Sequence, residues 1–243
     1  MNLKDTLRSV YLWWRERKFR HLKNQELEEV FTEIYDKNAW GGEPGKFYSG
    51  TGTHNPNTAI YIENVVRFIK ERNIKSVLDI GCGDFTVMQQ VTASIADVQY
   101  LGVDLVSSLI ENHRQKFQNE RVQFSVLNAV KDQLPQADLI TVRQVLQHLS
   151  NAHIQVILQK LAQHKYVLIT EHVPIGPDIT PNLDKIAGSH IRIRVNSGVF
   201  IDKPPFSLPN VKVLFEYRHD DPIKGKLVPA VIRTYLVENT TAS

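Results

Sequence analysis

The sequence predicts an α/β domain with a mostly parallel sheet of seven strands, helices on both faces, an antiparallel strand at one edge and a helical N-terminal extension. Five short β-rich runs alternate with stretches of helical periodicity, a pattern typical of parallel sheets. Two later β-rich runs have only a turn-rich connector between them, so we expect an antiparallel hairpin. The runs are Ser76–Ile80, Gln99–Asp104, Val122–Leu127, Asp138–Val142, Tyr166–Thr170, Val211–Tyr217 and Ala230–Glu238.

The composition agrees with one folded domain. The chain has 243 residues, 42% of them hydrophobic and 23% charged, and a chain of this size can bury a sizeable core. The net charge of +3, from 29 basic and 26 acidic residues, does not by itself indicate a nucleic-acid partner. The single cysteine, Cys82, excludes an internal disulfide and fits a reducing cytoplasm. No Cys and His residues show zinc-ligand spacing, so we expect no metal.

The N-terminal segment differs in charge from the rest of the chain. Residues 1–24 carry seven basic and two acidic residues, and Leu3, Leu7, Val10 and Trp14 recur at helical spacing, which predicts a basic amphipathic helix. Packing of this helix on the domain, or on a second subunit of a homodimer, is the favoured interpretation. Peripheral contact with an anionic membrane surface is the alternative. No apolar run has the roughly 18 residues of a membrane span, so we expect a cytoplasmic protein, either free or at the inner membrane face.

A second helix and a long loop complete this extension. Hydrophobic residues at helical spacing predict the helix near 25–36. The stretch 38–57 is rich in Gly, Pro, Ser, Thr and Asn, and its aromatic residues favour an ordered, functional loop. Pro56 fits the first turn of the next helix. We therefore divide the chain into an extension, residues 1–57, and a main domain, residues 58–243.

The glycine-containing stretch 76–91 is the most informative one. A buried strand includes Asp79, and Gly81 and Gly83 then make a tight turn into a helix, so bare backbone can approach a ligand there. Asp104 ends the next strand, where a carboxylate can accept hydrogen bonds from both hydroxyls of a ribose. Two such strands in order indicate a nucleotide-type crevice far more strongly than a lone glycine motif.

Residues of the turn distinguish two ligand classes. A dinucleotide site favours a third Gly or Ala where Thr86 stands, and Asp84 in the turn would repel a pyrophosphate. A ligand with an amino group and a sulfonium, but no phosphate, tolerates Asp79 and Asp84. S-adenosylmethionine (SAM) is such a ligand, and we expect it as the cofactor.

These motifs resemble those of the class I SAM-dependent methyltransferases, which have a Rossmann-like fold. The resemblance covers roughly residues 76–172, and the motifs WGG, FYSGTGT, DIGCGDF, YLGVDLV and VRQVLQHL are similar to those of a bacterial subgroup associated with glycan or secondary-metabolite tailoring. It implies that Asn128 binds the adenine amino group, for which an ordinary turn residue is the alternative, and that the segment at Ser49 covers the cofactor's carboxylate. The cofactor-binding residues it implies are Ser49, Gly50, Gly52, Asp79, Gly81, Gly83, Asp104, Asn128, Arg143 and Gln144.

A hydroxyl that accepts a methyl group must lose its proton, and a positioned His or carboxylate is the usual base. His148, Glu171 and His172 follow the fourth and fifth strands, at the edge where this fold has its site, and we take them as catalytic candidates. His148 is the first choice. A histidine at a helix start, bonded to the backbone, is the alternative for it.

The proline-rich segment 173–209 lies after the fifth strand. It can hang over the crevice and define the acceptor pocket, with Arg192 and Arg194 in functional positions. The alternative is a small added strand made by the alternating Ile191, Ile193 and Val195, with the arginines solvated.

The sequence thus predicts an enzyme that transfers the methyl group of SAM to a sugar or small-molecule hydroxyl by in-line displacement. Two alternatives remain. An RNA acceptor would use the basic residues 1–24 as a phosphate-tracking arm, although nothing else supports a nucleic-acid partner. A non-catalytic cofactor-binding or membrane-associated scaffold protein would keep the fold without turnover.

Overall fold

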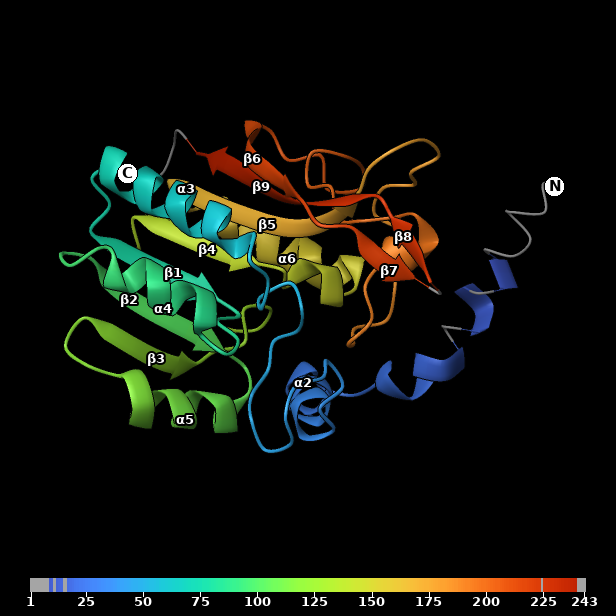
Figure 1. The fold of residues 1–243 in the computed structure, drawn as a ribbon, viewed down its shortest axis with the longest axis horizontal. Coiled ribbons are helices and arrows are strands. Elements are labelled where there is room, and N and C mark those ends of the chain that lie inside the picture. Colours follow the sequence, from blue (N-terminus) through green and yellow to red (C-terminus); the bar gives the residue numbers. More distant parts are fainter. Residues whose placement is uncertain (1–8, 11, 15–16, 224, 240–243) are drawn as a thin grey trace.

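Seven strands form one sheet in the order β3-β2-β1-β4-β5-β9-β6 (Figure 1). The structure, a computed structural model, describes residues 9–10, 12–14, 17–223 and 225–239. Strands β1 to β5 are parallel, and β9 lies between β5 and β6 and is antiparallel to both, which confirms the predicted sheet and its hairpin edge. The strands are β1 (Ser76–Ile80), β2 (Gln99–Asp104), β3 (Val122–Val126), β4 (Leu139–Arg143), β5 (Tyr166–Pro174), β6 (Val211–Arg218) and β9 (Ala230–Glu238).

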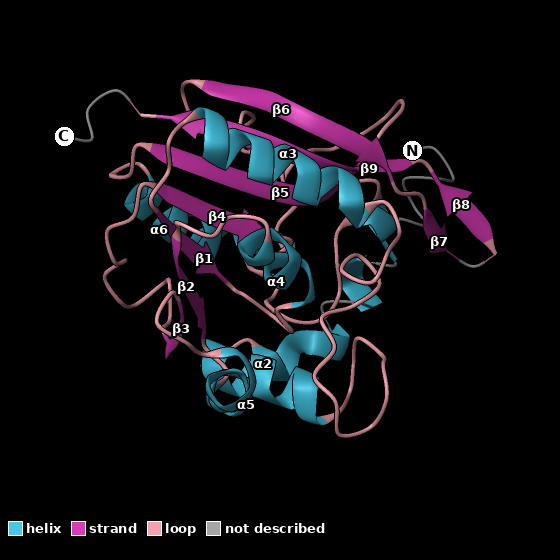
Figure 2. Cartoon of the chain, turned by 60° about the vertical axis from the view of Figure 1, so that its left-hand side comes forward, coloured by secondary structure: helices cyan, strands magenta, loops and turns pink. Residues whose placement is uncertain are grey.

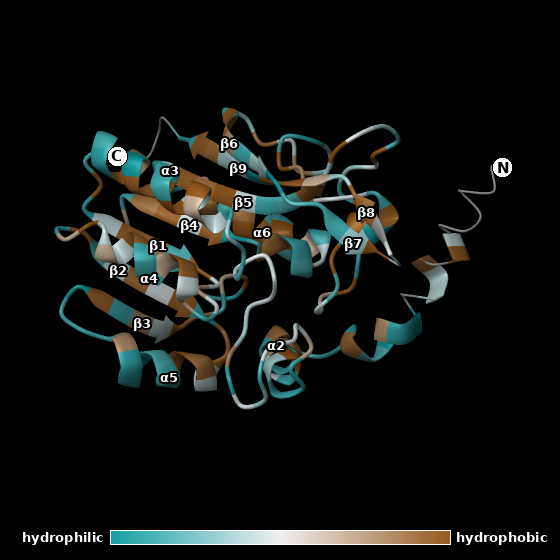
Figure 3. Cartoon of the chain, in the orientation of Figure 1, coloured by the Kyte–Doolittle hydropathy of each residue, from teal (hydrophilic) through white to brown (hydrophobic). Residues whose placement is uncertain are grey.

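Each face of the sheet has its own hydrophobic core. Because strand side chains alternate between faces, Leu78 packs with α2 and α6 whereas Val77 packs with α3 and α4. Figure 2 shows α3 and α4 on one side of the sheet and α6 on the other. Figure 3 shows hydrophobic residues concentrated on the strands between these layers. The helices are α2 (Leu27–Asp36), α3 (Thr58–Glu71), α4 (Thr86–Ala93), α5 (Ser107–Phe117) and α6 (Asn151–Leu161).

Element boundaries differ from the predictions where tertiary pairing intervenes. The fifth strand continues to Pro174 because β9 pairs with it along its whole length. Helix α3 begins at Thr58, so Pro56 lies before the helix rather than in its first turn. The turn-rich connector contains two short strands, β7 (Asp221–Ile223) and β8 (Lys226–Val228), that the sequence did not predict.

The first part of the N-terminal extension, before α2, is helical at residues 9–10, 12–14 and 17–19. Its predicted apolar stripe is not packed on the domain where the structure describes it, since Val10 and Trp14 are 58% and 51% exposed. The other two members of the stripe, Leu3 and Leu7, lie outside the described residues.

Segment 173–209 contains no added strand at the predicted place. Ile193–Val195 forms a 3₁₀ turn, and Arg192 is only 1% exposed rather than solvated. The alternation of apolar and basic residues wrongly suggested that this arginine is solvated, because a guanidinium can be buried when main-chain carbonyls accept its N–H groups.

Candidate functional site

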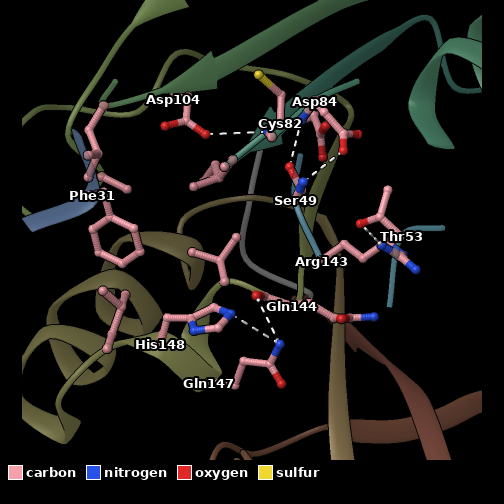
Figure 4. Close-up of a pocket in the computed structure, with 18 of the residues that line it drawn as sticks. Phe31, Ser49, Thr53, Cys82, Asp84, Asp104, Arg143, Gln144, Gln147 and His148 are labelled. Carbon is pink, nitrogen blue, oxygen red and sulfur yellow. Dashed lines mark hydrogen bonds between the residues drawn. The ribbon is translucent and has the colours of Figure 1, made fainter. Parts of the chain in front are cut away.

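A pocket opens at the carboxyl ends of β1, β2 and β4 (Figure 4). Helix α2 and the loop after it supply the opposite wall, whereas none of the lining residues comes from 173–209. Within the described part of the chain, no three His, Cys, Asp or Glu side chains gather in a way that could hold a metal ion. The predicted site residues that line the pocket are Ser49, Asp79, Gly81, Gly83, Asp104, Asn128, Arg143, Gln144 and His148.

The two glycines after β1 have backbone conformations and surroundings that exclude a side chain. Gly81 and Gly83 have φ angles of +70° and +54°. A Cβ at Gly81 would lie 2.4 Å from Val145 Cγ2, and one at Gly83 would lie 2.5 Å from Ser49 Oγ. Bare backbone therefore forms this part of the pocket wall.

Asp79 is buried beneath the glycine turn. Its carboxylate accepts hydrogen bonds from the Tyr100 hydroxyl at 2.8 Å and the Thr141 hydroxyl at 2.6 Å. Burial raises the pKa of Asp79 despite these two donors. Because Tyr100 is on β2 and Thr141 on β4, Asp79 also joins the three strand ends that form the pocket floor.

Asp104 presents a carboxylate at the end of β2. The amide of Gly83 donates to its Oδ2 at 3.3 Å, and the amide of Val106 donates to its Oδ1 at 3.1 Å. Burial nevertheless raises the pKa of Asp104 to about 6. Each oxygen can accept a further hydrogen bond, so two adjacent hydroxyls of a ligand would stabilise the charged form.

The loop after α2 is clasped to the glycine turn. The amide of Ser49 donates to Asp84 Oδ2 at 2.8 Å, and the amide of Asp84 donates to Ser49 Oγ at 2.7 Å. His54 Nε2 also lies 2.8 Å from Asp84 Oδ2. Burial alone would raise the pKa of Asp84, but the hydrogen bonds from Ser49, His54 and Thr86 outweigh burial and keep the pKa below its usual value. Sequence reasoning missed His54, whose contact depends on how the loop folds back.

Arg143 and Gln144 anchor the same loop from β4. Arg143 Nη2 donates to the Gly52 carbonyl at 2.7 Å. The carboxamide of Gln144 packs against Gly52, where a Cβ would lie 2.1 Å from Gln144 Oε1. Gly50 and Gly52 themselves do not line the pocket. Of the segment predicted to cover the cofactor, Ser49 thus lines the pocket, and Arg143 and Gln144 hold the segment in place by their contacts with Gly52.

Asn128 lines the pocket with its polar atoms already engaged. Its Oδ1 accepts from the amides of Val130 and Lys131 at 2.9 and 3.3 Å, and its Nδ2 donates to Glu28 Oε1 at 2.8 Å. This arrangement corresponds to the turn interpretation, and the adenine contact stays a prediction. Glu28, on α2, had no local signal in the sequence.

His148 lies in the 3₁₀ turn Leu146–His148, where it lines the pocket beside the Trp40 ring at a centroid distance of 5.1 Å. Its Nδ1 is 3.3 Å from the Gly188 carbonyl oxygen, which can only accept, so Nδ1 carries the hydrogen. Nε2 therefore accepts a hydrogen bond, at 3.4 Å, from the side-chain amide nitrogen (Nε2) of Gln147. Burial lowers the pKa of His148 to about 3, so the ring is neutral at physiological pH.

Glu171 and His172 do not line the pocket. The fully buried carboxylate of Glu171 accepts from the amides of Leu146 and Gln147 at 2.9 and 3.0 Å, and burial raises its pKa to about 8. His172 Nε2 lies 2.8 Å from the carbonyl oxygen of His219, to which it donates. Their catalytic roles stay predictions, and what the geometry adds is that Glu171 supports the turn that carries His148.

Arg192 supports this turn from its other side. Its guanidinium donates to the carbonyls of Gln147 at 3.0 Å and Leu149 at 2.9 Å. Segment 173–209 therefore holds the residues around His148 in place from behind, instead of lining the pocket. The sequence identified Arg192 as a candidate functional residue, but it did not predict that its side chain is buried.

Comparisons with known proteins agree with this architecture. Residues 78–165 match the family model described as a methyltransferase domain, and no curated protein matches the chain. The structure of human N-acetylserotonin methyltransferase in complex with SAM is 15% identical over 96% of this chain and 68% of its own, with a TM-score of 0.52. Magnesium protoporphyrin IX methyltransferase from Synechocystis PCC 6803 is 11% identical over 86% of this chain and 99% of its own, with a TM-score of 0.53. The N-methyltransferase NodS from Bradyrhizobium japonicum WM9 is 10% identical over 75% and 88%, with a TM-score of 0.50.

At these identities the solved structures show the fold, which is the Rossmann-like methyltransferase fold. The family match covers β1 to β4 and so includes the glycine turn, Asp104 and His148.

Proposed function

We propose that this protein is a SAM-dependent methyltransferase that methylates a hydroxyl of a sugar or another small molecule, as in the glycan- and metabolite-tailoring subgroup that its motifs resemble. One observation carries the proposal. A single pocket joins the bare glycine turn and the half-buried carboxylate of Asp104 to a neutral histidine, His148. One pocket would therefore hold both the cofactor and the group that removes the proton.

The cofactor side of the pocket fits an adenosyl group. Asp104 would accept hydrogen bonds from the two ribose hydroxyls, and the backbone of Gly81 and Gly83 would lie against the ligand. The clasp between Ser49 and Asp84 would keep the loop closed over the methionine end. No phosphate site is needed, which agrees with an acidic Asp84 in the turn.

The acceptor side fits a hydroxyl nucleophile. SAM would supply an electrophilic methyl group on its sulfonium, and the protein's own task is to orient the acceptor in line and remove its proton. His148 Nε2 is the atom that would take this proton, in place of its hydrogen bond from Gln147, because Nδ1 is committed to the Gly188 carbonyl. Because burial disfavours the protonated ring, the proton would move to His148 only as the methyl group is transferred. Trp40 lines the pocket beside His148, where it would exclude water and contact the face of an acceptor ring.

Two measurements test the proposal. Titration calorimetry with S-adenosylhomocysteine (SAH) should detect binding that Asp104→Ala abolishes, with Glu111→Gln on α5 as a control for removal of a surface carboxylate. Radiolabelled SAM should then transfer its methyl group to a sugar or metabolite fraction of a cell extract, giving a product that behaves as an ether. Absence of SAH binding would refute the cofactor assignment. Binding without transfer to any fraction would favour the scaffold alternative, and label in RNA would favour the RNA alternative.

A further inference from the structure

The described part of the N-terminal helix turns an aromatic and basic surface to solvent. Val10 and Trp13 are each 58% exposed and Trp14 is 51% exposed. Steps of three and four residues bring these side chains and Arg17 to one face of a helix. Arg17 lies over the Trp13 ring at 5.5 Å, and Lys18 lies over the Trp14 ring at 5.4 Å. We call these five residues the tryptophan face.

The other side of the same helix is already used by the domain. Leu12 and Phe19 line a groove together with Ile186 and Ala187 of segment 173–209. The Phe19 ring stacks on His190 with a centroid distance of 4.1 Å. Figure 1 shows the blue N-terminal segment extending outward from this attachment, beyond α2. Attachment to the domain uses other side chains of this helix and leaves Val10, Trp13 and Trp14 more than half exposed.

The charge around this face selects its partner. Among the described residues from 9 to 25, Arg17, Lys18, Arg20 and Lys23 are basic and none is acidic. A second copy of the chain would bring these like charges together, so it is disfavoured as the cover. Tryptophan rings at the level of the headgroups, with Lys and Arg beside anionic lipids, are typical of helices that lie on a bilayer surface.

We propose that the tryptophan face binds the surface of an anionic lipid bilayer and holds the protein there as a peripheral membrane protein. No helix among the described residues is long and apolar enough to cross a membrane, so the contact is an interfacial one. Leu27, at the start of α2, lines both the groove behind the N-terminal helix and the candidate active site. The attachment of the N-terminal helix therefore lies next to the candidate active site.

Vesicle flotation with the full chain tests this proposal. The protein should float with vesicles of phosphatidylcholine that contain about 30% phosphatidylglycerol, and much less with phosphatidylcholine alone. Trp13→Ala/Trp14→Ala should lower the partition coefficient about tenfold or more. Arg17→Glu/Lys18→Glu should lower it by at least about fivefold for each residue changed, and salt near about 0.5 M should weaken wild-type binding.

A matched control lies on the sheet edge. Val213 and Leu214 of β6 are 51% and 37% exposed beside a basic residue, Lys212, so Val213→Ala/Leu214→Ala removes two exposed apolar side chains elsewhere. This variant should float like the wild type. Equal flotation of the tryptophan variant and the wild type, or equal flotation with neutral and anionic vesicles, would overturn the proposal. A dimer seen by light scattering that Trp13→Ala/Trp14→Ala dissociates would also overturn it. The proposal does not depend on methyl transfer, because SAH affinity and flotation are measured separately.

Discussion

The carboxyl group of Asp104 should make SAH binding depend on pH. Burial raises its pKa from 3.8 to about 6, so a substantial fraction is protonated in mildly acidic solution. This rise in pKa means that the ionised carboxyl group lowers the free energy of unfolding by about 3 kcal/mol at neutral pH. Hydroxyl groups of a bound ribose would donate to the ionised carboxylate and offset part of this cost, so the ionised protein should bind the ligand more tightly.

The size of the effect follows from this pKa. If only the ionised form binds, the apparent Kd is the intrinsic Kd divided by the ionised fraction, so affinity should be about tenfold weaker at pH 5 than at pH 7. Titration calorimetry with SAH at pH 5, 6, 7 and 8 measures this slope. Asp104→Asn keeps the size of the side chain but does not titrate, and it should bind about 10- to 100-fold more weakly at pH 7 with no slope.

Stability gives an independent check of the same group. A raised carboxyl pKa contributes stability that is fully present below pH 3.8 and is lost as the pH rises through about 6. The ligand-free wild type should therefore lose stability across this window relative to Asp104→Asn, while Glu111→Gln behaves as the wild type in both assays. A wild-type SAH affinity that is constant from pH 5 to 8, or an equal slope in Asp104→Asn, would refute the reasoning.

Three further predictions concern the turns that form the pocket. His148→Ala should lower kcat for methyl transfer about 10²- to 10⁴-fold with little change in SAH affinity, and a loss below about tenfold would argue against a base at this position. Gly83→Ala should abolish SAH binding in calorimetry because its Cβ would meet Ser49 Oγ at 2.5 Å, whereas Gly45→Ala, which has a φ of +78° but no atom within 4 Å, should only lower the thermal midpoint. Glu171 contributes stability that is present below pH 4.5 and is lost as the pH rises through about 8, so the wild-type midpoint should fall more steeply between pH 5 and 8 than that of Glu171→Gln and level off above this range; parallel curves would contradict the assignment.

Most of the sheet was predictable because strand periodicity and turn residues are local signals. The runs at Ser76–Ile80 and Gln99–Asp104 agree with β1 and β2 residue for residue. The crevice was predictable for the same reason, since parallel strands bring Asp79 and Asp104 to one edge. The fifth strand was predicted too short because its last residues, up to Pro174, are extended by pairing with β9 near the end of the chain.

The side-chain partners in and around the pocket were harder to predict because these contacts join distant segments. The adenine contact of Asn128 stays a prediction, and no local pattern indicated that its side-chain amide donates to Glu28, 100 positions away. The catalytic role of Glu171 stays a prediction, and the sequence did not show that its carboxylate accepts hydrogen bonds from the amides of Leu146 and Gln147, in the turn that contains His148. Arg192 read as solvated in one interpretation, although its donors reach carbonyls more than 40 positions earlier.

The sequence by itself determined the strand order along the chain, the glycine turn and the two aspartates, because backbone sterics and side-chain periodicity act between neighbouring residues. Only the tertiary structure decided that α2 and the loop after it, rather than segment 173–209, form the outer wall of the pocket. It alone decided that two tryptophans near the N-terminus face solvent. Both outcomes depend on which apolar segments pack against the domain. Packing of this kind is decided between segments that are far apart in the sequence, and a local sequence pattern carries no information about it.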